Sequence, residues 1–164
     1  MALGLELHQK PRSEASLSDE YETPIELCYR LWDQYNWNPR LDVAANDNNH
    51  KCVHWLDDAL EQDWLDFDDC TDIEIKSDIW CNPPHSLNES FVRKAYLEWI
   101  RNDLNIMMII PTNTMSSKYW HECIEGMAEY HPIKGRIRFL VDGKPSKYAS
   151  RNAYCVVIWR KLNK

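Results

Sequence analysis

The segment with the clearest capacity for chemistry is Asn82-Pro83-Pro84-His85, which follows a short apolar run at 77–81. Proline has no N–H group, so the carbonyl oxygens of this segment stay available as hydrogen-bond acceptors. The side-chain oxygen of Asn82 and the carbonyl of Pro83 can then accept hydrogen bonds from both N–H groups of one exocyclic amine. The lone pair of such an amine is delocalised into the base ring. Two acceptor oxygens in fixed positions shift this electron density back to the nitrogen. The tetrapeptide therefore predicts a site that activates an amino group, with a simple turn as the alternative interpretation.

The elements that must position this segment alternate between strand and helix. Apolar patterns predict strands at 41–45, 77–81, 104–110, 137–141 and 154–159, and helices at 24–35, 88–102 and 117–127. Thr23 is the expected N-cap of the first helix, and Pro24 its first residue. The alternation predicts a mostly parallel α/β sheet, and the final strands predict an antiparallel edge near the C-terminus. In such a sheet the residues after a strand face the ligand crevice.

The length of 164 residues suits one domain, which we expect at 19–164 after a flexible arm at 1–18. The six cysteines form no CxxC pair, and neither a signal peptide nor a membrane-length apolar run is visible. These features predict reduced thiols in a cytoplasmic protein without a membrane partner. Cys52 and His54 lack a second ligand pair at zinc-site spacing, so we predict no metal site.

The formal net charge of −7 disfavours a protein that clamps long stretches of duplex, because phosphate contacts require Lys and Arg. The charge is unevenly distributed. The segment 57–78 is strongly acidic, whereas the segment 134–164 is rich in Lys and Arg. The C-terminal third is therefore the expected contact region for any nucleic acid.

Ordered sequence elements also accompany the tetrapeptide. They are Asp19–Pro24, Leu41–Ala45, Asn48–Cys52, Leu60–Trp64, Asn82–Ser86, Lys94-Ala95 and Gly135–Phe139. Together they resemble the phage-type DNA N6-adenine methyltransferase family over about residues 19 to 160. The resemblance implies a Rossmann-like fold that uses S-adenosylmethionine to methylate the N6 amine of adenine in DNA, with the base flipped into a pocket at 82–85. If the gene is phage-encoded, the expected location is the cytoplasm of a bacterial host.

The resemblance also implies a cofactor site. Thr23 and Pro24, with Tyr21 nearby, are expected near the methionine end, and Asp42 is expected to meet the cofactor's amino group. Ala44 and Ala45 would let the ligand approach closely, and either Asp57 or Asp58 would bind the ribose hydroxyls. Asp63 and Trp64 would frame the adenine of the cofactor. Alternative interpretations are a loop-capping role for Asp42 and core packing for Trp64.

His85 departs from the family pattern, which has a large aromatic residue at this position to stack on the flipped base. Imidazole has a smaller π face and titrates near neutral pH, so we expect stacking with weaker or pH-dependent catalysis. Two alternatives to N6-adenine methylation of DNA remain. The protein could methylate cytosine N4 or an RNA base, or it could be a catalytically weak cofactor-binding module that acts with a partner.

Specificity is expected from short loops at 112–118 and 143–151, because no segment is long enough to form a separate recognition domain. The protein is expected to be a monomer or a homodimer. The residues predicted to contact DNA are Ser86, Lys118, Arg136, Arg138, Lys147 and Arg151.

Overall fold

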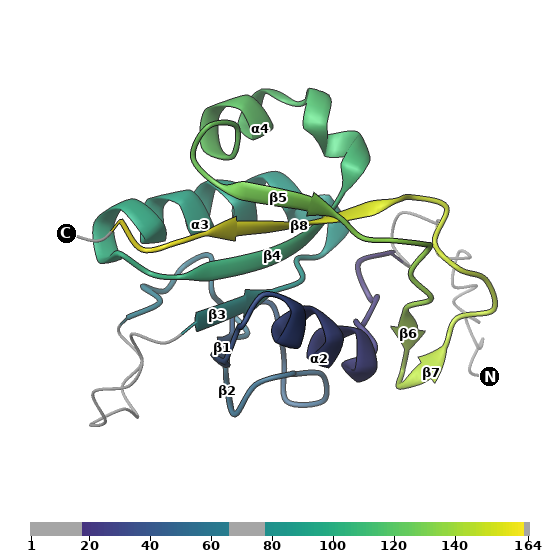
Figure 1. The fold of residues 1–164 in the computed structure, drawn as a ribbon. Helices are drawn as coiled ribbons and strands as arrows, with labels where there is room; N and C mark the ends of the chain where they lie inside the picture. The colour runs from purple at the N-terminus through teal and green to yellow at the C-terminus, as the bar shows by residue number, and fades with distance from the viewer. Residues whose placement is uncertain (1–17, 66–77, 163–164) are drawn as a thin grey trace, which may run out of the picture.

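The computed structural model describes residues 18–65 and 78–162, around a six-stranded sheet with the order β2-β1-β3-β4-β8-β5 (Figure 1). The strands are β1 (Pro39–Asp42), β2 (His54–Trp55), β3 (Asp78–Cys81), β4 (Ile106–Pro111), β5 (Glu129–Pro132) and β8 (Tyr154–Trp159). Strands β2, β1, β3 and β4 are parallel, whereas β8 is antiparallel to β4 and to β5. The predicted α/β class and the antiparallel C-terminal edge are confirmed.

Helices cover both faces of the sheet (Figure 1). Side chains alternate along β4, as the pleat of a strand requires. Ile106, Met108 and Ile110 belong to the apolar cluster that includes α3 (Asn88–Asn102) and α4 (Lys118–Cys123). Met107 and Ile109 belong to the cluster on the opposite face, which includes α2 (Ile25–Gln34). Burial on both faces explains why the sequence of this strand is continuously apolar.

The helix α3 has the predicted bounds and ends at Asp103, whose left-handed φ of 53° breaks the helical path. The helix α4 is shorter than predicted and is capped by the Ser117 side chain, which accepts a hydrogen bond from the Trp120 N–H. The prediction of Thr23 as an N-cap is wrong. Pro24 occupies the N-cap position of α2 without a side-chain cap, because the Thr23 hydroxyl is engaged elsewhere.

The predicted strand at 137–141 is also largely wrong. Only β6 (Leu140–Val141) is regular, and it pairs with β7 (Lys144–Pro145) in a separate two-stranded hairpin (Figure 1). Asp142 and Gly143 turn this hairpin with φ values of 51° and 72°, as a two-residue turn requires. The strand beyond β8, at the antiparallel edge of the main sheet, is instead β5, which apolar patterning missed. Residues 57–62 form hydrogen-bonded turns rather than a helix.

The five cysteines in the described part of the chain are buried and unpaired. No helix of the described residues is long and apolar enough to cross a membrane. The N-terminal arm expected at 1–18 lies, except for Ser18, outside the described residues, as does most of the acidic segment 57–78.

Candidate active site

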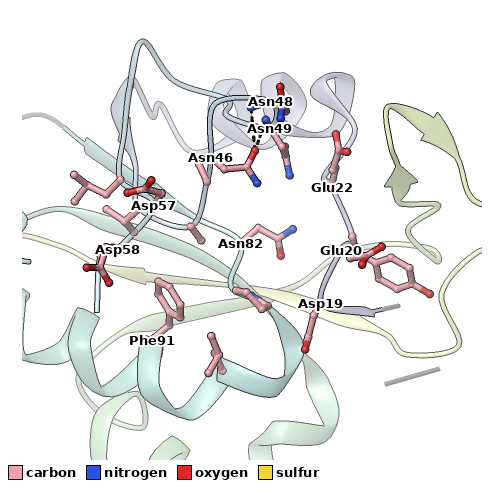
Figure 2. Close-up of a pocket in the computed structure, with 18 of the residues that line it drawn as sticks. Asp19, Glu20, Glu22, Asn46, Asn48, Asn49, Asp57, Asp58, Asn82 and Phe91 are labelled. Atoms are coloured by element: carbon pink, nitrogen blue, oxygen red, sulfur yellow. Dashed lines mark hydrogen bonds between the residues drawn. The ribbon is translucent and has the colours of Figure 1, made fainter. Parts of the chain in front are cut away.

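A cavity of about 500 Å³ lies at the carboxyl ends of β1, β2 and β3 (Figure 2). Segments 43–49, 56–60 and 82–91, which follow these strands, line it, and the segment 19–22 completes its wall. Because the strands are parallel, they deliver all three segments to the same edge of the sheet. The crevice predicted from the sequence is therefore present, and we name it the acidic cavity.

The walls of the acidic cavity combine negative charge with apolar surface. Its carboxylate residues are Asp19, Glu20, Glu22, Asp57, Asp58 and Asp142, and its large apolar residues are Tyr21, Val43, Leu56, Leu60, Leu87 and Phe91. None of the described residues that line it is Lys or Arg. Such a lining favours a ligand that carries positive charge together with a planar or aliphatic part.

Asn82 occupies the wall of the acidic cavity and is held by a residue far away in sequence. Its side-chain nitrogen donates a hydrogen bond of 2.8 Å to the Thr23 hydroxyl, and Thr23 is only 1% exposed. This bond fixes the amide, so its oxygen remains an acceptor for a ligand. Pro83 is buried behind it, and Pro84 lines the cavity. The structure therefore joins Thr23 to the tetrapeptide that the sequence singled out.

His85 lies at the junction of two further cavities. One, of about 850 Å³, is lined by Tyr21, His85 and the loop 146–152, and we name it the loop cavity. The other, of about 360 Å³, includes Ser86. Nε2 of the imidazole is hydrogen-bonded to the Tyr154 hydroxyl, at a distance of 2.8 Å. Burial lowers the pKa of His85, and the negative charge of Asp19 opposes this shift only in part. The ring is therefore uncharged at neutral pH.

Tyr21 separates the acidic cavity from the loop cavity and lines both. Its ring stacks on Phe139 with a centroid distance of 5.0 Å and an interplanar angle of 8°. It meets the His85 ring edge to face, with centroids 5.9 Å apart. Tyr21 and His85 thus form an aromatic corner between the two cavities, beside Asn82.

The residues predicted to contact DNA do not all lie in one place. Lys147 and Arg151 line the loop cavity. The exposed Arg138 donates from Nε to the Ser146 carbonyl at 2.7 Å, and Arg136 donates to the Arg151 carbonyl, so both also brace the loop. The backbone N–H of Ser86 donates to Asp19. Lys118 is 83% exposed on α4 beside Glu122.

Asp42 is placed differently from the sequence-based expectation. It is 3% exposed and does not line the acidic cavity. Its two carboxylate oxygens accept hydrogen bonds from the backbone N–H groups of Ala44, at 3.2 Å, and Lys51, at 2.9 Å. The structure therefore gives it the loop-capping role, since it fixes both ends of the segment that lines the cavity. Ala44 and Ala45 do line the cavity, as predicted.

The structure also does not bring Asp63 and Trp64 to the cavity. Trp64 is fully buried in the core, and its indole N–H donates to the Ala59 carbonyl at 2.8 Å. The exposed Asp63 accepts hydrogen bonds from the backbone N–H of Leu65 and the side chain of Asn102. Asp57 and Asp58, between which the sequence could not choose, both line the cavity.

Sequence reasoning missed several residues of this region. Asn46 and Asn49 line the acidic cavity and bridge each other across a tight turn. Phe91 reaches the cavity from α3. Tyr154 contacts His85 from the first position of β8, and no local sequence signal links these two residues.

Known proteins resemble this chain over most of its length. The family described as DNA N-6-adenine-methyltransferase (Dam) matches residues 10–164. A DNA N-6-adenine-methyltransferase of Escherichia phage T1 is 25% identical over 142 residues, which are 85% of this chain and 55% of that protein. The chain thus spans about half the length of this curated relative. The match over nearly the whole chain shows that it belongs to the DNA N-6-adenine-methyltransferase (Dam) family.

Proposed function

We propose that this protein transfers a methyl group from S-adenosylmethionine to the N6 amine of adenine in DNA. The observation that carries the proposal is the meeting of two cavities at Asn82-Pro83-Pro84-His85, with Tyr21 in the wall of both. The acidic cavity takes the methyl donor and the loop cavity takes the flipped base. The amine and the methyl group then meet beside Asn82.

The acidic cavity fits the methyl donor in size and charge. Its volume of about 500 Å³ lies within the range of small-molecule sites. The donor carries a sulfonium and an ammonium group, both of which acidic walls favour, and a purine that suits Phe91 and Leu60. Asp57 and Asp58 offer carboxylates to its ribose hydroxyls. When bound, S-adenosylmethionine supplies an electrophilic methyl group on sulfur and leaves as a neutral thioether.

Asn82 and Pro83 activate the amine. The Asn82 side-chain oxygen and the Pro83 carbonyl accept hydrogen bonds from its two N–H groups, which concentrates electron density on the nitrogen as the N–CH₃ bond forms. Thr23 keeps the amide of Asn82 in the orientation that presents the oxygen. The nitrogen gains the methyl group and releases one proton to water. Fixed placement of the reactants, rather than a strong base, supplies most of the acceleration.

His85 and the loop 146–152 hold the nucleic acid. The neutral imidazole offers a π face to the base in the loop cavity, and the exposed Tyr148 adds a second aromatic surface. Lys147 and Arg151 line this cavity and bind backbone phosphates near the base. We also propose that residues 19–164 act as one domain, as a monomer or homodimer, in the cytoplasm.

The test is nucleoside mass spectrometry of DNA incubated with the protein and S-adenosylmethionine. We expect N6-methyladenine with the parent protein and with Thr23→Ser, and none with Asn82→Ala. Calorimetry should show that Asn82→Ala still binds the cofactor. Methylcytosine without methyladenine would overturn the choice of base. Cofactor binding without methylation of any base would instead support the cofactor-binding module, and no binding at millimolar cofactor would refute the proposal entirely.

A further inference from the structure

A chain of hydrogen bonds runs from the loop of the loop cavity to the ring of His85. The backbone N–H of Asn152 donates to the Ser150 hydroxyl oxygen at 3.2 Å. The Ser150 hydroxyl donates to the Tyr154 oxygen at 3.3 Å. The Tyr154 hydroxyl lies 2.8 Å from Nε2 of His85. Ser150 and Asn152 line the loop cavity, so the chain begins where we place the DNA.

Two donors to the Tyr154 oxygen fix the direction of the last bond. The Ser150 hydroxyl donates to this oxygen, and the side-chain hydrogen bonds of Ser150 and Asn152 both oppose the rise in the pKa of Tyr154, as donors to a phenol oxygen do. The Tyr154 proton is then left for Nε2 of His85. A neutral imidazole that accepts at Nε2 carries its proton at Nδ1. The polarity of the chain thus selects one of the two neutral tautomers.

Tyr154 itself is shielded from water and uncharged. Tyr154 is 1% exposed and packs against Phe139, with ring centroids 5.1 Å apart. Burial raises the pKa of Tyr154 to about 12, so the phenol keeps the proton that it donates. Other ionisable groups around His85 come from every neighbouring element: Asp19, Tyr21, Lys147, Tyr148 and Arg151, and on the far side Glu89 and Tyr119.

We infer that Tyr154 is a positioning residue that holds His85 as the neutral Nδ1–H tautomer, with its ring fixed at the border of the loop cavity. Its catalytic consequence rests on the function proposed above. Imidazole is smaller than the aromatic residue of the family pattern and has no bulk of its own to fix its orientation. The bond from Tyr154 replaces that bulk. A shift of Ser150 or Asn152 when DNA binds passes directly to the ring that stacks on the base.

The test is nitrogen NMR of histidine-labelled protein, with Tyr154→Phe as the variant and Tyr130→Phe as the control on exposed β5. The variant keeps the buried ring and loses only the hydroxyl, and thermal unfolding checks that it is folded. In the parent protein we expect His85 protonated at Nδ1. In Tyr154→Phe we expect Nε2 protonation to appear, and the pKa of His85 to rise by about half a unit to one unit, because the lost bond stabilised the neutral ring.

The methylation assay on the same proteins separates this inference from the proposed function. We expect Tyr154→Phe to lower kcat about three- to tenfold, with the acidic limb of its pH profile moved to higher pH and cofactor affinity unchanged. Parent protein protonated at Nε2, or a variant with an unchanged tautomer and pKa, would overturn the positioning role. If the NMR changes occur but the parent protein methylates no DNA, the proposed function alone fails.

Discussion

Replacement of Asp42 by Asn tests how the loop of the acidic cavity is held. The carboxylate is buried and accepts two backbone N–H bonds, from Ala44 and Lys51. Burial is the main cause that raises its pKa from 3.8 to about 6, and the two N–H bonds oppose the rise. A raised folded-state pKa means that the folded protein binds this proton more tightly than the unfolded chain does. The resulting stability is fully present below pH 3.8 and is lost as the pH rises through 6.

The size of the effect follows from these two pKa values. Between pH 7 and pH 5, protonation of Asp42 should add about 1.4 kcal/mol to the free energy of unfolding, a roughly tenfold change in the equilibrium constant. Asp42→Asn cannot titrate, so the difference in stability between parent and variant should change by this amount. The assay is urea unfolding at both pH values, with the exposed Asp33→Asn as control. If the difference in the free energy of unfolding between parent and variant is independent of pH, Asp42 is not a buried carboxyl that titrates in this range.

The same variant distinguishes the observed position of Asp42 from the contact with the cofactor's amino group expected from the sequence. Asn can accept only one of the two N–H bonds, so we expect Asp42→Asn to weaken S-adenosylmethionine binding through the loop. A cofactor analogue that lacks the amino group should lose the same affinity in parent and variant, because Asp42 does not line the cavity. A coupling energy above about 1 kcal/mol in this double cycle would place Asp42 against the ligand instead.

Three further substitutions test the site. Thr23→Val removes the hydroxyl that orients Asn82, and kcat should fall about tenfold in steady-state methylation, whereas Thr23→Ser should retain activity. His85→Tyr should change turnover because the stacking ring changes, and equal turnover would show that residue 85 is not a stacking platform. Lys147→Ala should reduce the dependence of log K on log salt for DNA binding by about one, and the exposed Arg30→Ala on α2 should not.

The parts of the fold that sequence patterns predicted are those with a strong local signal. The continuous apolar run of β4 and the amphipathic α3 can be recognised without knowledge of their neighbours. The edge strand β5 (Glu129–Pro132) could not, because its side chains are mostly exposed and its pairing with β8 supplies its regularity. Ile137 and Phe139 are buried and alternate like a strand, yet their carbonyls accept hydrogen bonds from the loop residues Ser150 and Ser146 rather than from a paired strand.

In the site, too, residues with a local sequence signal were predicted, whereas roles that depend on distant contacts were not. Asn82 was recognisable because its neighbours are two prolines after a strand, and Ala44 and Ala45 because they follow a strand with small side chains. The loop-capping role of Asp42 was only an alternative, since it depends on a backbone N–H nine residues away. Trp64 was ambiguous because the same ring suits a core and a purine, and only its bond to Ala59 decides between them. Tyr154 depends on a contact with His85, which lies 69 residues away in the sequence.

The wall between the two cavities joins early and late parts of the chain. Glu22 and Leu140 exchange two backbone hydrogen bonds of 2.9 Å each, and Tyr21 stacks on Phe139 beside them. A nascent chain that has released only its first 120 or so residues from the ribosome holds the strand-end loops but not this wall. If the acidic cavity binds the cofactor as proposed, capture should therefore begin only late in synthesis. Stalled nascent chains that end before Phe139 and still retain S-adenosylmethionine would contradict this timing.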